Sequence, residues 1–594
     1  MTTEVTIPGK TVCELVQYWG SIDTNATPAF ISVFMNGKNC SLSRKEVLDL
    51  SRRFAFRLKE LGITKGLIVC NALPNSLERV VCEFGIAFSG AASMNGQIFR
   101  TDGEDFLETL KNSKCSAVIL DPSIPQGARK ILLEEVPIGC ENDVQSQLLP
   151  HLKHIIACTR DDFNPSNDFI TSLKNPALPE YTADVNPSDM VTVLTTSGTT
   201  GYSKLVRFCH ANICGFGIQV KAIEPMNPGD HFINIAPMGW AGGYPQWYLS
   251  CGVTRYFFDM HAGPIPDVAS AIWKTIVQEK IVYGFINPYY VKSILSNTSL
   301  WKNSHWKPKY LCLAGQPVKQ DTLGVIGKLC DAVDINYGMT ECNLVATHRI
   351  ADPSSYIDNC VGYPGYDVQI KIVDIDMQEV DNGKTGQVLV KSPTLSMGYL
   401  NNEAATNSSF LADGWFCTDD AGYIGADGKL YVEGRQSDTI MRAGYILYPS
   451  WLEKKFKEVP EVLDIVLVAV PDKLWGNEIC ACVVISGVEG VWAGRKPTDG
   501  CEDLNKQTSD SKFCEDSVIK NGKVGKQPTA DVDLELLEKQ LRSFADSIEL
   551  VNEKDIMRLV PKYYVFMDKF PLTNSGKVSR KEMRKMAATL FDLL

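Results

Sequence analysis

One run of hydroxyl-bearing and glycine residues in this sequence has the composition of a ligand-binding loop. The run occupies residues 195–204, reads TTSGTTGYSK, and follows the apolar residues 190–194. That order predicts a buried strand that ends in a polar loop. Gly198 and Gly201 allow backbone N–H groups to turn toward one point, and Lys204 adds a positive charge. The loop is therefore a candidate for binding the phosphates of a nucleotide.

The loop does not match the P-loop pattern, in which the lysine is followed by serine or threonine, because Leu205 follows Lys204. A surface loop without a ligand is the alternative, since Ser, Thr and Gly also populate turns for reasons of backbone conformation. The candidate nucleotide contacts in this loop are Thr196, Ser197, Gly198, Thr199, Thr200, Gly201 and Lys204.

A second polar stretch, YGMTE at residues 337–341, follows a strand predicted at residues 332–335. An aromatic ring can stack on a base. A carboxylate near phosphates is tolerated chiefly when a hard cation such as Mg²⁺ lies between them. This combination suits a nucleotide site, and the alternative is a turn in which Glu341 is solvated.

Two more stretches place charged groups in turn-like surroundings. DGWFCTDD at residues 413–420 has acidic residues after a short apolar pair, where a carboxylate could accept both ribose hydroxyls or could lie in an exposed turn. PLTNSGKVSR at residues 571–580 places Lys577 on a Gly-Ser turn. A basic tail of this kind is, on its own, usually a solvated face.

Together these stretches resemble the signatures of the adenylate-forming enzymes, which include acyl-CoA synthetases, beetle luciferases and the adenylation domains of nonribosomal peptide synthesis. TTSGTTGYSK resembles their phosphate-binding signature, YGMTE is similar to YGxTE, GWFCTDD to GWxxTGD, and PLTNSGKVSR to PxTxSGKxxR. The chain departs from the usual residues at four positions, where the superfamily has Pro, Gly, Gly, and Asp or Lys. These positions are Ser203, Leu205, Asp419 and Ser437.

The resemblance implies a role for individual residues. On the nucleoside side it implies that Tyr337, followed by Gly338, contacts the adenine and that Asp420 binds the ribose. The remaining nucleotide contacts that it implies are the adenine-side turn Gly315-Gln316-Pro317 and the arginine Arg435.

On the reacting side, the resemblance implies that Thr340 contacts phosphate and that Glu341 binds Mg²⁺. Lys577 would reach from a small domain into a large one. One cation that bridges the attacking carboxylate and the α-phosphate lowers the barrier between like charges. Gly444 would line the path of the pantetheine arm of coenzyme A.

Apolar periodicity predicts the elements that hold these residues. Ser43 and Glu46 have the spacing of a capping box and begin a helix predicted at residues 43–62. Strands and helices alternate through most of the chain, which predicts an α/β fold: a large N-terminal domain of mixed or parallel sheets with helices and a small antiparallel region, then a smaller α+β domain. We place the domains at residues 1–434 and 435–594, with a flexible insertion at about 487–530.

Composition excludes several other classes of protein. The net charge of -11 argues against a nucleic-acid-binding protein. The 19 cysteines contain no C-x-x-C pair, and the 7 histidines show no zinc-ligand spacing, so we expect reduced thiols and no structural metal. No signal peptide, transmembrane run or C-terminal S-K-L is present in this sequence, which predicts a cytoplasmic protein.

The predicted activity is ligation of a carboxylic acid to coenzyme A, with ATP and Mg²⁺, through an acyl adenylate. Gly239-Trp240 is similar to the acyl-pocket segment of acetyl- and medium-chain acyl-CoA synthetases, which favours a fatty or other aliphatic acid; a tryptophan in the core is the alternative. Three other functions stay open: loading of a carrier protein, a luciferase-like reaction, and a non-catalytic member that binds nucleotide or partners.

Overall fold

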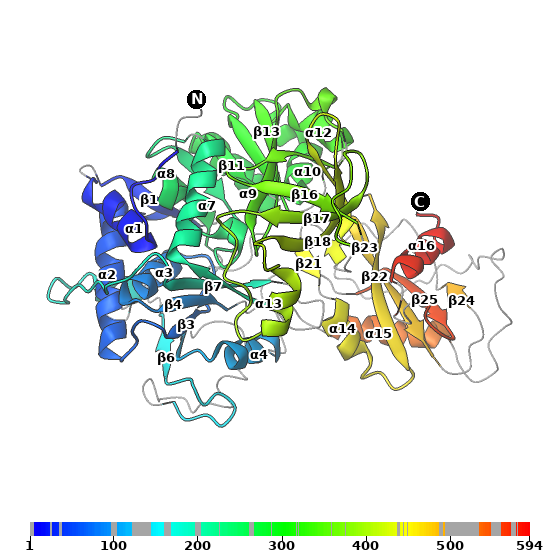
Figure 1. The fold of residues 1–594 in the computed structure, drawn as a ribbon, viewed down its shortest axis with the longest axis horizontal. Coiled ribbons are helices and arrows are strands. Elements are labelled where there is room, and N and C mark those ends of the chain that lie inside the picture. The colour runs from blue at the N-terminus through cyan, green and yellow to red at the C-terminus, as the bar shows by residue number, and fades with distance from the viewer. Residues whose placement is uncertain are drawn as a thin grey trace. The chain divides into compact units, whose positions relative to one another are not determined.

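A computed structural model describes most of the chain. The described residues are 5–23, 26–34, 39–96, 104–121, 144–159, 168–196, 204–224, 226–259, 267–286, 288–315, 318, 320–357, 359–374, 376–435, 440–442, 445–447, 449–473, 475–485, 491–493, 534–547, 560–571, 578 and 580–593. They form two compact units, one within residues 1–436 and one within residues 437–594. Figure 1 shows both units and labels many of their helices and strands.

The first unit contains a six-stranded sheet with the order β6-β5-β3-β4-β7-β8. All neighbouring strands in it are parallel except the last pair, β7 and β8, which are antiparallel. The strands are β3 (Ile68–Asn71), β4 (Ala92–Asn95), β5 (Ala117–Leu120), β6 (His154–Ala157), β7 (Met190–Thr196) and β8 (Lys204–Cys209). Because β7 and β8 pair from Met190 to Thr196, the intervening residues join two fixed strand ends.

A thirteen-stranded sheet makes up the rest of the first unit, in the order β16-β17-β18-β19-β15-β14-β13-β12-β11-β9-β10-β1-β2. The run from β1 to β13 is parallel, and the run from β13 to β16 is antiparallel. The strands are β1 (Pro28–Val33), β2 (Asn39–Ser43), β9 (His231–Asn234), β10 (Thr254–Phe258), β11 (Tyr283–Phe285), β12 (Tyr310–Ala314), β13 (Ala332–Met339), β14 (Asn343–Ile350), β15 (Cys360–Pro364), β16 (Gln369–Val373), β17 (Gly386–Lys391), β18 (Phe416–Ile424) and β19 (Leu430–Arg435). The antiparallel region that the sequence predicts is this second run.

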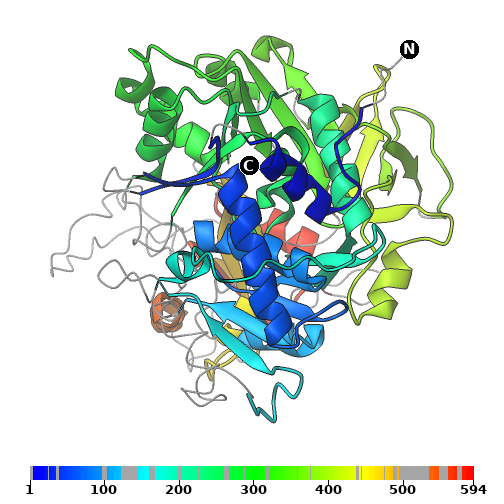
Figure 2. The ribbon, with the colours of Figure 1, turned by 90° about the vertical axis from the view of Figure 1, so that its left-hand side faces the viewer.

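Helices cover the sheets of the first unit. They are α1 (Val12–Ser21), α2 (Arg44–Glu60), α3 (Leu77–Ser89), α4 (Glu104–Ser113), α6 (Phe169–Leu173), α7 (His210–Ile223), α8 (Gln246–Cys251), α9 (Val268–Gln278), α10 (Pro288–Ser296), α11 (Thr298–Trp301), α12 (Gln320–Ile326) and α13 (Glu403–Ser409), with short 3-10 turns at Ala241–Gly243 and Pro353–Ser355. Figure 2 shows α2, in blue, in front of the strands of the six-stranded sheet. Phe54 of α2 belongs to the same buried cluster as Val69 and Ala117 of that sheet. None of the described helices is long and apolar enough to cross a bilayer.

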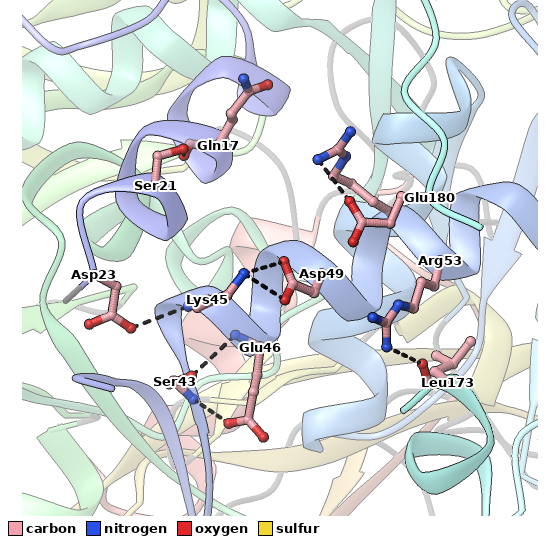
Figure 3. Close-up of polar contacts among 11 residues, drawn as sticks. Gln17, Ser21, Asp23, Ser43, Lys45, Glu46, Asp49, Arg53, Leu173 and Glu180 are labelled. Carbon is pink, nitrogen blue, oxygen red and sulfur yellow. Dashed lines mark hydrogen bonds and ion pairs between the residues drawn. The ribbon is translucent and has the colours of Figure 1, made fainter. Parts of the chain in front are cut away.

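The predicted start of α2 is confirmed. The Ser43 hydroxyl accepts from the N–H of Glu46 at 3.1 Å, and the Glu46 carboxylate accepts from the N–H of Ser43 at 3.0 Å. Figure 3 shows this reciprocal pair together with the ion pair between Lys45 and Asp49 one turn further on. A capping box satisfies two N–H groups that the first turn of a helix would otherwise leave unpaired.

The second unit is built on a four-stranded sheet, β22-β23-β25-β24, and a two-stranded sheet, β20-β21. Its elements are β20 (Ile440–Arg442), β21 (Tyr445–Leu447), α14 (Pro449–Phe456), β22 (Asp464–Asp472), β23 (Gly476–Val484), β24 (Val491–Ala493), α15 (Leu534–Ser547), β25 (Tyr563–Met567) and α16 (Arg580–Leu590). Helices packed against a mixed sheet give this unit the α+β character that the sequence predicts.

Two local predictions need correction. Part of the segment predicted as a flexible insertion, 487–530, is the strand β24, because Val491 and Trp492 favour extended backbone and residues 491–493 pair with β25. The rest of that segment lies outside the described residues. The strand predicted to end at Ile335 runs on to Met339, since β14 pairs with it from Val333 to Met339.

Candidate nucleotide-binding site

Tyr337 and Asp420 are hydrogen-bonded to each other although their strands are not neighbours in the sheet. Tyr337 is in β13, and its hydroxyl donates to Oδ2 of Asp420, which is in β18, at 2.6 Å. Asp420 is 3% exposed. Burial, and then the negative charge of Asp420, raise the pKa of the Tyr337 phenol well above its ordinary value, so it stays a donor. The two residues that the sequence assigns to adenine and ribose are therefore direct neighbours.

The residue before Asp420 has an unusual backbone conformation. Asp419 has a φ of +62°, in the left-handed region, where glycine is preferred. The pairing of β18 with β17 shifts register between Gln387 and Leu389, next to this residue. The N–H of Asp420 donates to the hydroxyl of Thr418 at 3.1 Å. The irregular backbone therefore lies directly beside Asp420, whose carboxylate accepts from Tyr337.

Glu341 lies in the turn that follows β13, and it is 7% exposed. Its Oε1 accepts a hydrogen bond from the hydroxyl of Tyr399 at 2.8 Å. The ammonium Nζ of Lys204 lies 4.8 Å from the centroid of the same Tyr399 ring. One aromatic side chain thus contacts the predicted Mg²⁺ ligand and the lysine of the predicted phosphate loop.

The strand ends that flank the predicted phosphate loop are well defined. Thr196 at the end of β7 is the pairing partner of Lys204 at the start of β8. Thr195 is 8% exposed, and its buried hydroxyl has no hydrogen-bond partner among the described residues. An unpaired buried hydroxyl is costly unless a ligand or water satisfies it, so this end of β7 is suited to a polar ligand. Residues 197–203 themselves lie outside the described residues.

The segment after β9, residues 236–243, is held by buried polar side chains. Asn75 accepts from the N–H of Met238 at 2.7 Å and donates to the carbonyl of Ala236 at 3.1 Å. Arg255 is 1% exposed and donates to the carbonyls of Gly243 at 2.5 Å and Asn234 at 3.2 Å. Burial chiefly, with the charge of Arg79, lowers the pKa of Arg255 to about 9. The predicted acyl-pocket segment therefore has a fixed backbone.

Of the remaining predicted residues, some are described by the structure and the others lie outside the described residues. Gly315 directly follows β12 and has a φ of +84°, Gly338 is in β13 beside a register shift, and Thr340 is half-buried in the following turn. Arg435 ends β19, and its backbone pairs with that of Asp420. Those that lie outside the described residues are Ser197, Gly198, Thr199, Thr200, Gly201, Gln316, Pro317, Gly444 and Lys577.

Sequence reasoning missed Tyr399, Asn75 and Arg255. Tyr399 precedes α13 in an unremarkable stretch, SMGYLNN, and no local spacing relates it to Glu341 or Lys204. A buried arginine also has no local signal, because β10 reads as an ordinary apolar strand apart from that residue. Only the folded arrangement brings these residues into the site.

The described residues fit a metal that arrives with a nucleotide. They contain no cluster of three or more His, Cys, Asp or Glu residues that could hold an ion by themselves. Mg²⁺ is usually held by one or two carboxylates together with substrate phosphates and water, and Glu341 supplies one carboxylate. The carboxylate of Glu341 would therefore fit Mg²⁺ that binds together with a triphosphate.

The chain matches a known family over most of its length. Residues 23–400 match the model of the AMP-binding enzyme family, so the chain belongs to the AMP-binding enzymes. The predicted superfamily is confirmed by this match. The predicted fold class is confirmed as well, because the solved structures that resemble this chain have the same two-domain α/β fold.

Its relatives act on different acids. The chain is 24% identical over 556 residues to an indoleacetate–CoA ligase of Aromatoleum aromaticum, which covers 92% of this chain and 93% of the relative. It is 23% identical over 442 residues to the long-chain-fatty-acid–CoA ligase FadD13 of Mycobacterium tuberculosis, covering 74% and 82%. The structure of the amide bond synthetase McbA from Marinactinospora thermotolerans superposes with a TM-score of 0.72 at 20% identity, covering 97% and 99%.

Proposed function

We propose that this protein activates a carboxylic acid with ATP to an acyl adenylate and then transfers the acyl group to coenzyme A. The observation that carries this proposal is the pair of contacts on one hairpin. Tyr337 of β13 meets Asp420, and Glu341, in the turn after β13, joins Lys204 through Tyr399. Tyr337, which is suited to a nucleoside, and Glu341, which is suited to the phosphate side, therefore lie four residues apart on the β13–β14 hairpin.

Four of the described site residues have a definite part in this proposed reaction. Asp420 accepts the ribose hydroxyls, and Tyr337 orients its carboxylate and offers a ring face to the adenine. Lys204 places a positive charge near the phosphates, and Glu341 would hold the Mg²⁺ that accompanies them. Bound Mg²⁺ would neutralise phosphate charge as the carboxylate approaches. Charges fixed in a buried site stabilise a transition state without reorganisation.

Lys577 and Gly444 complete the proposal, although both lie outside the described residues and rest on their sequence motifs. Lys577 would bridge the attacking carboxylate and the α-phosphate. Gly444 would line the path of pantetheine in the second step. Movement of the smaller domain between the two steps would exchange these groups.

We infer an aliphatic acid as the substrate. Support comes from Gly239-Trp240 in the segment that Asn75 and Arg255 hold, because a bulky indole at a fixed backbone position shortens a pocket. Relatives include ligases for a long-chain fatty acid and for indoleacetate, so the substrate must be tested over both classes.

The first experiment is acid-dependent ATP–pyrophosphate exchange over a panel of straight-chain and aryl acids, followed by thioester formation with coenzyme A. We expect exchange with at least one aliphatic acid. Thioester formation only on a phosphopantetheinylated carrier protein would favour the carrier-loading alternative. Absence of exchange over the whole panel would favour a non-catalytic protein, an alternative motivated by the four departures at Ser203, Leu205, Asp419 and Ser437.

A lysine variant tests the reaction at its chemical step. We expect Lys577→Ala to lower single-turnover adenylate formation by about 100-fold or more, because a preorganised charge contact is lost. Lys569→Ala, in the same terminal region, is the control and should retain the rate. An unchanged rate in Lys577→Ala would remove this lysine from the mechanism.

A further inference from the structure

We propose that Tyr399 is a positioning residue that fixes Glu341 and Lys204 relative to each other on the phosphate side of the site. The inference rests on the proposed function. The Tyr399 hydroxyl donates to Oε1 of Glu341 at 2.8 Å, and its ring centroid lies 4.8 Å from Nζ of Lys204. Tyr399 is 4% exposed and Glu341 is 7% exposed, so their hydrogen bond is largely buried, whereas Lys204 is half-buried.

The backbone on each side of Tyr399 is tied to β8. The N–H of Leu400 donates to the carbonyl of Leu205 at 2.7 Å, and the N–H of Arg207 donates to the carbonyl of Gly398 at 3.0 Å. Tyr399 itself is in antiparallel bridge with Val206. These bonds place Tyr399 beside β8, the strand that begins with Lys204. The Tyr399 ring therefore contacts the Lys204 ammonium because residues 398–400 pair with residues 205–207.

A second set of contacts ties the same segment to Glu341. The N–H of Ser396 donates to the backbone carbonyl of Glu341 at 2.8 Å. Gly398 has a φ of +85° and a Cβ there would lie 2.5 Å from Thr406, so no larger residue fits before Tyr399. The segment 396–400 is therefore held between β8 and the turn that carries Glu341.

The Tyr399 side chain is itself constrained. Its ring packs edge-on against Phe410 with centroids 5.8 Å apart. The N–H of Tyr399 donates to the hydroxyl of Thr406 at 3.0 Å. A side chain held from both its backbone and its ring makes its hydrogen bond in one orientation only. The carboxylate that accepts this bond is oriented in turn.

The chemistry of the contact suits a metal ligand. A phenol hydroxyl is a hydrogen-bond donor, and that of Tyr399 points at one oxygen of the Glu341 carboxylate. Among the described residues, none hydrogen-bonds the other carboxylate oxygen, Oε2. A hydrogen bond that orients a carboxylate ligand from outside the metal's own ligands is a common feature of metal sites.

Two substitutions separate the hydroxyl from the ring. Tyr399→Phe keeps the ring over Lys204 and the packing on Phe410 but removes the donor to Glu341. Tyr399→Leu removes both. The control is Tyr256→Phe, because Tyr256 is 1% exposed and its hydroxyl donates to the carboxylate of Glu279 at 3.0 Å, away from the proposed site.

The readout is ATP binding by calorimetry, without any acid substrate, at a series of MgCl₂ concentrations and in EDTA. Mg²⁺ should increase the affinity for ATP. We expect Tyr399→Phe to raise the Mg²⁺ concentration that gives half of this increase about tenfold or more, as loss of an orienting partner does. Its affinity for ATP in EDTA should equal that of the wild type. Tyr399→Leu should also weaken ATP binding in EDTA by about threefold to tenfold, because Lys204 loses the ring.

The outcomes distinguish this inference from the proposed function. If wild-type protein binds no ATP, both are wrong. If wild-type binding depends on Mg²⁺ and Tyr399→Phe matches Tyr256→Phe, this inference alone is wrong. A lower melting temperature in Tyr399→Phe with an unchanged Mg²⁺ dependence would mean that Tyr399 only supports the fold, and it would likewise overturn the inference.

Discussion

Asp419 occupies a backbone position that most side chains avoid. Its φ of +62° lies in the left-handed region, where a Cβ crowds the following carbonyl oxygen, and aspartate tolerates this better than most residues. The adenylate-forming enzymes that this chain resembles have glycine at the matching position. In this chain an aspartate therefore adopts a conformation that glycine adopts at no steric cost.

Substitutions at Asp419 should follow this conformational preference. We expect Asp419→Gly to be more stable than Asp419→Ala by about 1 kcal/mol, because alanine has a Cβ and no side-chain hydrogen bond to offset the strain. Urea unfolding of the two variants and the wild type measures the difference. Equal stabilities would mean that the left-handed conformation is not kept in solution.

The hydroxyl groups of Tyr337 and Tyr399 share one property at the residue scale. Each donates to a buried carboxylate, Asp420 or Glu341, and each has a pKa raised by burial first and by that carboxylate second. Neither phenol ionises near neutral pH. Both carboxylates therefore have a neutral, fixed donor, which orients them without cancelling their charge.

At the scale of elements, α1 is attached to α7 by a histidine. The Nδ1 of His210, the first residue of α7, accepts from the N–H of Val12 in α1 at 3.1 Å. His210 is 1% exposed. Burial chiefly lowers its pKa from 6.5 to about 4, and nearby Asp189 opposes the shift. The contact requires the neutral ring, since a protonated Nδ1 cannot accept.

The stability of the large unit should fall on acidification because of this histidine. Above pH 6.5 the ring is neutral in the folded and the unfolded chain. Between pH 6.5 and about 4 only the unfolded chain gains the proton, so stability falls by about 1.4 kcal/mol per pH unit from this group. Below about 4 the folded ring is protonated too, and this contribution becomes constant.

His210→Asn tests that slope. We expect the stability difference between wild type and variant to shift by about 2 kcal/mol in favour of the variant from pH 7 to pH 5. Urea unfolding at the two pH values measures it. His151→Asn, at an exposed position, serves as the control. Parallel pH profiles for wild type and His210→Asn would show that His210 titrates normally.

At the scale of the whole molecule, each unit has its own core. The buried clusters of the described residues divide at the boundary between the units. Those that include Val12, Ile233 or Val345 lie within residues 1–436, and those that include Ile440 or Val466 lie within residues 437–594. A unit that buries its own apolar surface can fold without the other.

We expect residues 1–436 alone to fold and to bind ATP with Mg²⁺, because the described groups proposed to bind it are in this unit. ATP at 100 times its Kd should then add about 2.7 kcal/mol to its stability. Adenylate formation should be lost, because Lys577 is absent. Thermal unfolding with and without Mg²⁺ and ATP tests the first part, and pyrophosphate exchange the second. A fragment that aggregates or shows no shift with ATP would contradict this view of the large unit.

Much of the fold could be predicted because its signals are local. The strand at Ala117–Leu120 and the helix from Arg44 to Glu60 follow from apolar runs, periodicity and a capping box. Strand ends were less predictable. The extension of β13 to Met339 and the strand β24 both depend on a partner strand that supplies hydrogen bonds, and a single segment does not reveal its partner.

The sequence by itself determined the family, the alternation of strands and helices, and the residue types of the nucleotide site, since each is written in short motifs and periods. Only the tertiary structure decided that Tyr337 meets Asp420 and that Tyr399 joins Lys204 to Glu341. Those contacts arise from pairing between segments far apart in the chain. Their geometry depends on the register of whole strands, which no local pattern encodes.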